Sequence, residues 1–353
     1  MQKDISGTIT KAGPIQESRT VDAPDNSALN ADRPRFWIRI LATGFSTLIL
    51  FLSAIIVTRI LLTTDYHAMR LAVQAMRMEQ FAAAFLFTAI SYLALTGYDA
   101  VAIRQLQLKV HFATMALASF TSFAISFTLG FPLVTAGTVR YWIYSRAGVS
   151  AANVASLTLI SGITFWLGMV LMIGIAFMLR PGHIAQVNQL TASLNFALGC
   201  AAVASILLYI IWVSRHRRRL SVKGIVLELP GFKLTVGQLM LGTIDLLCAS
   251  AALYILLPEG HGLGFMTFVA IYVLGCLLGI ASHAPGGIGA FEVTIINMVP
   301  STSVEALLAA LLLFRLIYYV VPFVFAFALL GANEIWRRWR GLRAEMSHQD
   351  VPK

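Results

Sequence analysis

Two charged residues stand inside long apolar runs, where an ionised side chain is costly and is therefore a candidate for function. Arg315 lies ten residues after Glu305 in EALLAALLLFRLIYYVVP, which is about 15 Å along a helix. Its planar guanidinium suits a phosphate or a carboxylate. Asp245 lies at a similar depth in VGQLMLGTIDLLCASAALYILL. We expect Arg315 either to serve a lipid-phosphate or coupling site, or to form a structural ion pair with Asp245.

A second candidate is the glycine-rich segment SHAPGGIGAFE, residues 282–292. Gly286 and Gly287 lack a Cβ, so their backbone amides are free to turn inward as a nest for an anion. Glu292 beside them is suited to take a proton or a cationic headgroup. No Gly-Lys-Ser/Thr follows, so the segment is not a P-loop. The alternative is a packing turn with a solvated Glu292.

A third candidate combines Asp99 in LTGYDAVAIRQL with the basic and aromatic segment TAGTVRYWIYSRAGVS, which contains Arg140 and Tyr141. Arginine binds phosphate, and Tyr and Trp favour the membrane interface, so this pattern suits a lipid headgroup. An ordinary positive-inside aromatic belt explains the same composition.

Catalytic and metal signatures are absent from the sequence. The seven histidines are scattered, with no HExxH motif or nucleophile elbow, and the three cysteines lie in apolar runs without zinc spacing. We therefore predict no catalytic residues, no metal and no cofactor.

The composition places these residues in a membrane. Of 353 residues, 58% are hydrophobic and only 12% are charged, about half the charged fraction of a soluble domain. The net charge is +10, and the basic residues lie next to the ends of apolar segments. This position favours anionic lipid headgroups over nucleic acid as the partner. We predict an all-α polytopic membrane protein.

About eight apolar runs are long enough to cross a bilayer. They cover approximately residues 37–62, 80–97, 111–136, 151–178, 192–213, 236–257, 263–281 and 305–330.

The basic regions place both termini and the loop near residue 215 in the cytoplasm. Odd numbers of runs separate these regions, so one run in each interval must enter and leave by the same face. Residues 111–140 and 263–292 carry the Pro and Gly that break a helix. We predict six full spans and these two re-entrant segments.

The order span, re-entrant segment, span then occurs twice, with opposite orientation. Paired broken segments in corresponding positions of two halves indicate a transport site near the middle of the membrane. Two independently irregular helices are the alternative to this inverted repeat.

The domain organisation follows from the same pattern. Residues 1–35 are polar and read as a disordered cytoplasmic tail, residues 36–332 as the membrane domain, and residues 333–353 as a basic cytoplasmic tail. The first apolar run begins too late and is too long for a cleavable signal peptide.

Four motifs resemble, in the same order, the membrane domain of the lysylphosphatidylglycerol synthase/flippase family, also called multiple peptide resistance factor. They are LTGYDAVAIRQL, LGFPLVTAGTVRYWIYSRAGVS with SGITFWLG after it, SHAPGGIGAFE and AALLLFRLIYYVVP. The resemblance covers roughly residues 35–332. It implies a flippase-like domain of a bacterial inner membrane that moves an anionic or aminoacylated phospholipid between leaflets and so supports resistance to cationic antimicrobial peptides.

The resemblance also selects residues. Asp99, Arg140, Glu292 and Arg315 lie within the motifs, whereas Asp245 lies outside them. The family's soluble acyltransferase domain is not expected here, because the sequence ends about 20 residues after the last run. Two alternatives stay open: a subunit that presents phosphatidylglycerol to a separately encoded aminoacyltransferase, and a small-solute or ion transporter. A homo-oligomer is compatible with each.

Overall fold

The computed structural model describes residues 77–349 apart from 131, 189, 216–218, 223–224, 229, 283–284 and 301–303, together with His67, Arg70, Leu71 and Gln74. All of them belong to one compact unit, Leu52–Lys353. The predicted tail 1–35 and the predicted first span 37–62 lie outside the described residues.

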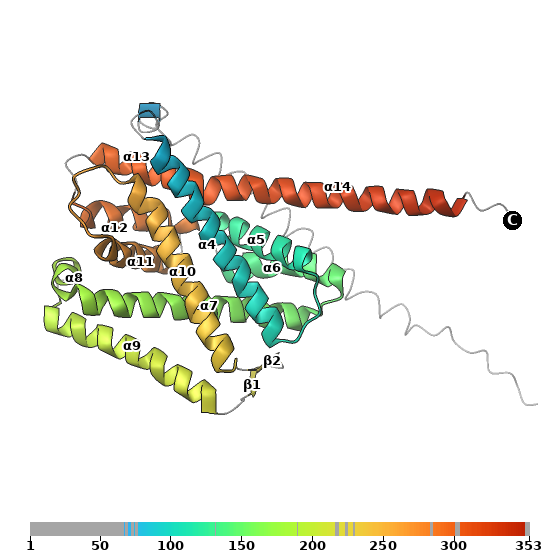
Figure 1. The fold of residues 1–353 in the computed structure, drawn as a ribbon, viewed down its shortest axis with the longest axis horizontal. Coiled ribbons are helices and arrows are strands. Elements are labelled where there is room, and N and C mark those ends of the chain that lie inside the picture. Colours follow the sequence, from blue (N-terminus) through green and yellow to red (C-terminus); the bar gives the residue numbers. More distant parts are fainter. Residues whose placement is uncertain are drawn as a thin grey trace, which may run out of the picture. The chain divides into compact units, whose positions relative to one another are not determined.

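Helices make up almost all of the described chain (Figure 1). They are α4 (Met78–Gln105), α5 (Phe112–Leu129), α6 (Pro132–Tyr144), η1 (Ser145–Ala147), α7 (Ala151–Leu179), α8 (Pro181–Asn188), α9 (Ala192–Arg215), α10 (Phe232–Leu256), α11 (Phe265–Ala281), η2 (Pro285–Gly287), α12 (Ala290–Met298), α13 (Val304–Arg315), the π-helical η3 (Leu316–Val320) and α14 (Val321–Gln349). One antiparallel hairpin, β1 (Arg219–Val222) with β2 (Ile225–Glu228), stands in the loop between α9 and α10.

Six helical stretches of the described residues are long and apolar enough to cross a membrane. All six match predicted apolar runs. They include Phe112–Leu129, part of a segment predicted as re-entrant, whereas Phe265–Ala281 is a shorter apolar helix. The last stretch, Ala306–Arg337, continues as α14 to Gln349, so the helix extends into the predicted C-terminal tail.

Both Gly- and Pro-containing segments interrupt a helix, as predicted. The first break follows α5 at Gly130, whose φ is +81°, and α6 then starts at Pro132, where the missing N–H costs no helical bond. The second break contains Gly286, Gly287 and Gly289, with φ of +61°, +65° and +91°, values that a side chain rarely permits. In each case the helices on the two sides of the break pack against each other, so that α5–α6 and α11–α12 form two helical hairpins (Figure 1).

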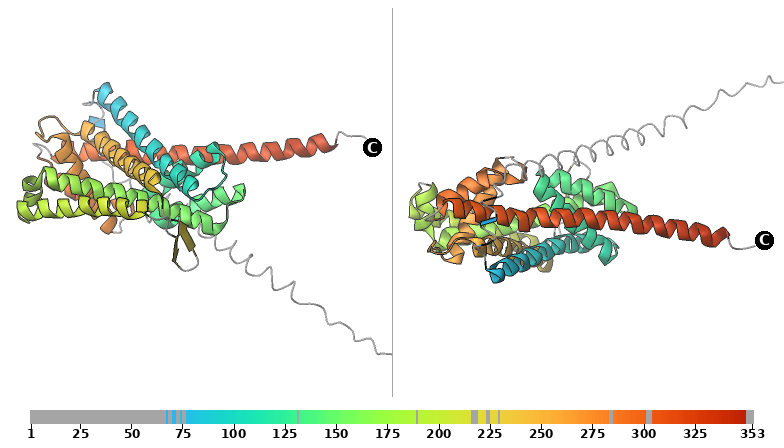
Figure 2. Two further views of the ribbon diagram at one scale, coloured as in Figure 1. Left: turned by 60° about the horizontal axis from the view of Figure 1, so that its bottom comes forward. Right: turned by 90° about the horizontal axis from the view of Figure 1, so that it is seen from above.

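The helix contacts follow a symmetric scheme. Helices α4 and α10, which begin the two predicted series of span, re-entrant segment and span, lie side by side in all views (Figures 1 and 2). Helix α5 of the first hairpin contacts α14, and helix α11 of the second contacts α7. Helices α7 and α10 cross closely, since a Cβ on Gly168 would lie 2.7 Å from the carbonyl carbon of Gly242.

A π-helical turn interrupts the last long helix at residues 316–320. Pro322 has no N–H, so the carbonyl of Tyr318 loses its i+4 donor. The hydroxyl of Tyr92 on α4 donates to that carbonyl at 3.1 Å. A neighbouring helix therefore satisfies the backbone group that proline leaves open, as required inside a membrane.

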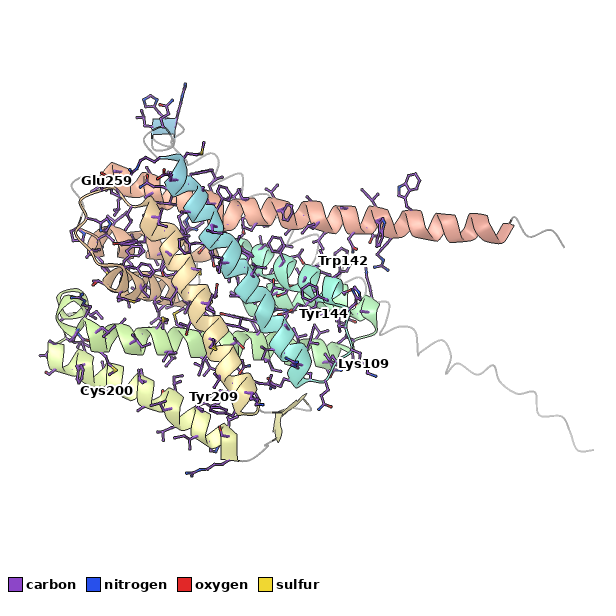
Figure 3. All side chains as sticks on the ribbon, in the orientation of Figure 1. Lys109, Trp142, Tyr144, Cys200, Tyr209 and Glu259 are labelled. Atoms are coloured by element: carbon purple, nitrogen blue, oxygen red, sulfur yellow. The ribbon has the colours of Figure 1, made fainter. Side chains whose placement is uncertain are left out.

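The labelled side chains in Figure 3 mark two opposite ends of the helix bundle. Lys109, Trp142 and Tyr144 lie at one end, and Glu259 lies at the other. We call these the Lys109 end and the Glu259 end. The chain reaches the Lys109 end at the close of α4 and α6, and the Glu259 end at the close of α10.

Candidate functional site

Asp99 and Arg140 form a fully buried ion pair that ties the first hairpin to α4. Arg140 donates from Nε to Asp99 Oδ2 at 3.0 Å and from Nη2 to Oδ1 at 2.7 Å. Tyr144 and Ser161 each donate a hydroxyl to the same carboxylate at 3.0 Å. The guanidinium also lies 4.8 Å from the ring centroid of Phe123. This geometry satisfies both oxygens of Asp99, which a buried carboxylate requires.

Glu292 and Arg315 form a second ion pair, which ties α12 to the end of α13. Both Nε and Nη2 of Arg315 donate to Glu292 Oε1. Nη1 of Arg315 reaches the carbonyl oxygen of Gly286 at 3.3 Å, and the backbone N–H of Gly289 donates to Glu292 Oε2 at 2.7 Å. The amide of this turn thus binds an anion, and the anion is the chain's own carboxylate. The side chains are 11% and 18% exposed, so this pair is more accessible than Asp99–Arg140.

Asp245 has a different set of partners from the one predicted. Ser91 donates its hydroxyl to Oδ1 at 2.5 Å, and Tyr98 donates to Oδ2 at 3.0 Å. Arg315 is paired with Glu292 instead. The prediction that Asp245 forms an ion pair with Arg315 is therefore wrong: helical depth gave both residues the same level, but the packing of α4 against α10 places hydroxyl groups beside Asp245.

A cavity of about 420 Å³ lies between the two hairpin breaks. Its wall is mostly apolar and aromatic, and Arg140, Asp245, Gly286 and Gly287 also line it. The break of the first hairpin contributes Gly130 and Pro132. Residues predicted from separate motifs thus meet around one space of the size that a ligand site has.

The tips of the two hairpins touch beside this cavity. A Cβ on Gly286 would lie 3.4 Å from the carbonyl oxygen of Phe127 and 3.5 Å from that of Thr128, both at the end of α5. It would also lie 3.6 Å from Nη1 of Arg315. These are ordinary van der Waals distances, so glycine is favoured at this position by its φ of +61° and not by lack of space.

Several residues of the site were not predicted. Tyr144 and Ser161 complete the Asp99 pair, and Ser91, Tyr98 and Tyr318 surround Asp245. Tyr144 follows Arg140 by one helical turn, a spacing that could have indicated it. The others come from distant helices.

Tyr141, a predicted site residue, does not join the buried group. Its side chain is 43% exposed, as an interfacial aromatic belt requires. Among the residues that the structure describes, no three His, Cys, Asp or Glu side chains gather as a group that could hold a metal ion.

Comparison with known proteins gives relatives but no matching family model. The chain is 32% identical over 263 residues to the uncharacterized protein slr0712 of Synechocystis, covering 74% of this chain and 82% of that protein. It is 28% identical over 243 residues to the inner membrane protein YbhN of Escherichia coli, covering 67% of this chain and 74% of YbhN. With the apolar helices, these similarities show a membrane protein.

A shorter similarity concerns an enzyme. Over 90 residues the chain is 38% identical to phosphatidylglycerol lysyltransferase of Staphylococcus epidermidis, which is 24% of this chain and 11% of that protein. The family resemblance predicted from the four motifs is confirmed by these relatives.

Proposed function

Since the chain belongs to the family of membrane proteins that includes slr0712 and YbhN and is related in part to phosphatidylglycerol lysyltransferase, we propose that it moves a phospholipid between the two leaflets of a bacterial inner membrane. The cargo is an anionic or aminoacylated lipid of the lysylphosphatidylglycerol kind. The observation that carries the proposal is the cavity of about 420 Å³ between two hairpin tips, with charged residues at its wall and an ion pair at its edge.

The proposed topology has six full spans, counting the predicted span 37–62, and two hairpins that enter the membrane from opposite faces. The symmetric contacts support it: α5 meets α14 as α11 meets α7, and α4 meets α10. The touching hairpin tips give the same support. Two inverted halves that meet at a central site are a frequent design for alternating access.

We further propose that the Lys109 end faces the cytoplasm, together with both termini. Two helices carry a basic residue in their last turn at this end: Arg104 in α4 and Arg215 in α9. At the Glu259 end, Arg77 pairs with Glu259 at 3.5 Å. An excess of Lys and Arg on one side sets the orientation of a membrane protein.

In the proposed mechanism, a lipid headgroup enters the cavity while its acyl chains stay in the bilayer. The phosphate competes with Glu292 for Arg315, whose guanidinium is a bidentate donor for either anion. Glycines at the tip allow the headgroup to approach the backbone. Relative movement of the two halves then opens the cavity to the other leaflet.

Transfer of a fluorescent phosphatidylglycerol between leaflets of reconstituted liposomes tests this proposal. A charge-assisted hydrogen bond contributes about 1.5–3 kcal/mol, so we expect Arg315→Ala to slow transfer about ten- to a hundredfold. Arg77→Ala, which removes an exposed arginine, is the matched control and leaves the rate within about twofold. Glu292→Gln removes the competing anion and retains transfer. A folded, inserted Arg315→Ala protein with an unchanged rate would remove Arg315 from the mechanism.

Cysteine accessibility tests the topology. Phe112 begins α5 and Met266 stands near the start of α11, and both side chains are exposed. In a protein whose native cysteines are replaced, Phe112→Cys should react with a membrane-impermeant reagent from the cytoplasmic side and Met266→Cys from the outer side. Reaction of both from one side would contradict the opposed hairpins.

A second candidate function is favoured by the similarity to phosphatidylglycerol lysyltransferase. Here the chain presents phosphatidylglycerol to a separate aminoacyltransferase. Co-purification of such an enzyme, with lipid aminoacylation that depends on this chain and no transfer between leaflets, would support this function over translocation.

A further inference from the structure

We propose that Asp245 is the site at which lipid transfer is coupled to a proton, an inference that rests on the proposed function and adds its energy source. Asp245 takes up a proton as anionic lipid enters the cavity and releases it after the lipid has left. The reaction is the reversible protonation of one carboxylate, and the proton comes from and returns to water that reaches the cavity.

The first argument is a contrast among the buried acids of the site. Asp99 is held by Arg140, and Glu292 is held by Arg315. Asp245 is 2% exposed, and within the described part of the chain no arginine, lysine or histidine lies in ion-pair range of it. A buried carboxylate without a cation is costly, and taking up a proton removes that cost. Asp99 and Glu292 therefore each have a cationic partner, whereas Asp245 has only hydroxyl partners.

The groups that face Asp245 from the helices packed around it are neutral. They are Ser91, Tyr92 and Tyr98 on α4, Cys248 on α10 itself, Tyr272 and Cys276 on α11, and Tyr318 and Tyr319 on η3. The other charged residue of the cavity wall, Arg140, already binds both oxygens of Asp99. No neighbouring charge therefore fixes the protonation state of Asp245.

The second argument is a chain of hydroxyl groups that can reverse its direction. The Ser91 hydroxyl donates to Asp245 Oδ1 at 2.5 Å and lies 2.7 Å from the Tyr318 hydroxyl. With Asp245 ionised, Tyr318 donates to Ser91 and Ser91 donates to the carboxylate. With Asp245 protonated, the carboxyl donates to Ser91 and Ser91 donates to Tyr318. Protonation at Asp245 thus changes the hydrogen bonding of Tyr318 on η3.

The third argument concerns the residue at the far end of this chain of hydroxyl groups, Tyr318. Tyr318 lies in the π-helical turn, next to the break that Pro322 imposes, and three residues after Arg315. Such a turn is a point where a helix bends readily. The proton site and the proposed phosphate site therefore share one irregular helical turn, which gives them a physical connection.

The fourth argument is electrostatic. Asp245 lines the same cavity that would hold the lipid headgroup, and two negative charges in a low-dielectric space repel each other. Protonation of Asp245 removes the repulsion, so lipid binding favours proton uptake and proton uptake favours lipid binding by the same factor.

The experiment uses the full chain in liposomes of phosphatidylcholine with phosphatidylglycerol, a fluorescent phosphatidylglycerol probe and an internal pH dye. For the wild-type protein we expect a pH gradient to change the transfer rate about tenfold, with proton movement that requires lipid. Asp245→Asn should bring the ratio of rates with and without the gradient to one and abolish the dye signal. Met240→Ala on the same helix replaces a side chain that is 60% exposed, so it is the control and should retain both effects.

Ser91→Ala and Tyr318→Phe keep the proposal falsifiable if Asp245→Asn does not fold, since each interrupts the hydroxyl chain and should lower the same ratio. If the wild-type transfer rate is the same with and without the pH gradient and no proton movement is detected, the inference is wrong, while the proposed translocation is still supported. Absence of wild-type transfer refutes the proposed function and this inference with it. An Asp245→Asn protein that keeps the gradient response but no longer binds lysylphosphatidylglycerol would assign Asp245 to an ammonium headgroup instead.

Discussion

Replacement of Arg140 by methionine gives a direct test of the buried pair that ties the first hairpin to α4. The substitution keeps much of the side-chain volume and removes both donors to Asp99, at 3.0 and 2.7 Å. Because the two side chains are 1% and 0% exposed, the remaining carboxylate has no access to water and retains only the hydroxyls of Tyr144 and Ser161. We expect Arg140→Met to lower the free energy of unfolding by about 3–5 kcal/mol.

The second half of this prediction concerns the source of the loss. If the unpaired charge is responsible, then Asp99→Asn added to Arg140→Met should restore about 1–3 kcal/mol, because it removes the carboxylate that lost its partner. Arg146→Met is the matched control: its pair with Glu334 is 33% and 36% exposed, and its guanidinium stacks 4.3 Å from the Trp142 ring. Such an exposed arginine contributes about 0–2 kcal/mol.

Equilibrium unfolding in mixed dodecyl maltoside and dodecyl sulfate micelles measures these differences. The reasoning is refuted if Arg140→Met is as stable as the wild-type protein. It is also refuted if the double variant is no more stable than Arg140→Met, because the loss would then come from packing and not from charge.

Two further predictions concern packing and backbone hydrogen bonds. Tyr92→Phe should cost about 1–3 kcal/mol in the same unfolding assay, because the Tyr318 carbonyl loses its donor at 3.1 Å and is left unsatisfied; an unchanged stability would mean that another donor replaces it. Gly168→Ala should cost about 1–3 kcal/mol, since its Cβ would lie 2.7 Å from backbone atoms of α10, whereas Gly137→Ala, with its nearest atom at 3.7 Å, should be neutral or stabilising by up to about 1 kcal/mol. Equal effects of the two alanines would argue against the close α7–α10 crossing.

The sequence by itself determined that this is a helical membrane protein, because runs of about 20 apolar residues have few other stable states. It also located the two helix breaks, since Pro lacks an N–H and glycines accept a positive φ, and these local properties do not depend on the rest of the fold. It selected Arg315 and Asp245 as charged residues at membrane depth, and the motifs added Asp99, Arg140 and Glu292 as site residues.

Only the tertiary structure decided which residues are the partners of these charged side chains. Depth along a helix placed Arg315 and Asp245 at one level, but pairing depends on which faces of the helices meet, and hydropathy carries no such information within uniformly apolar helices. The close packing of α4 on α10 gave Asp245 its hydroxyl groups, and the meeting of the two hairpin tips created the cavity. The chemistry of single residues is written in the sequence. Whether a buried carboxylate has a cationic partner or only hydroxyl partners depends instead on contacts between separate helices, as between Asp99 and Arg140, 41 residues apart, or Ser91 and Asp245, 154 residues apart.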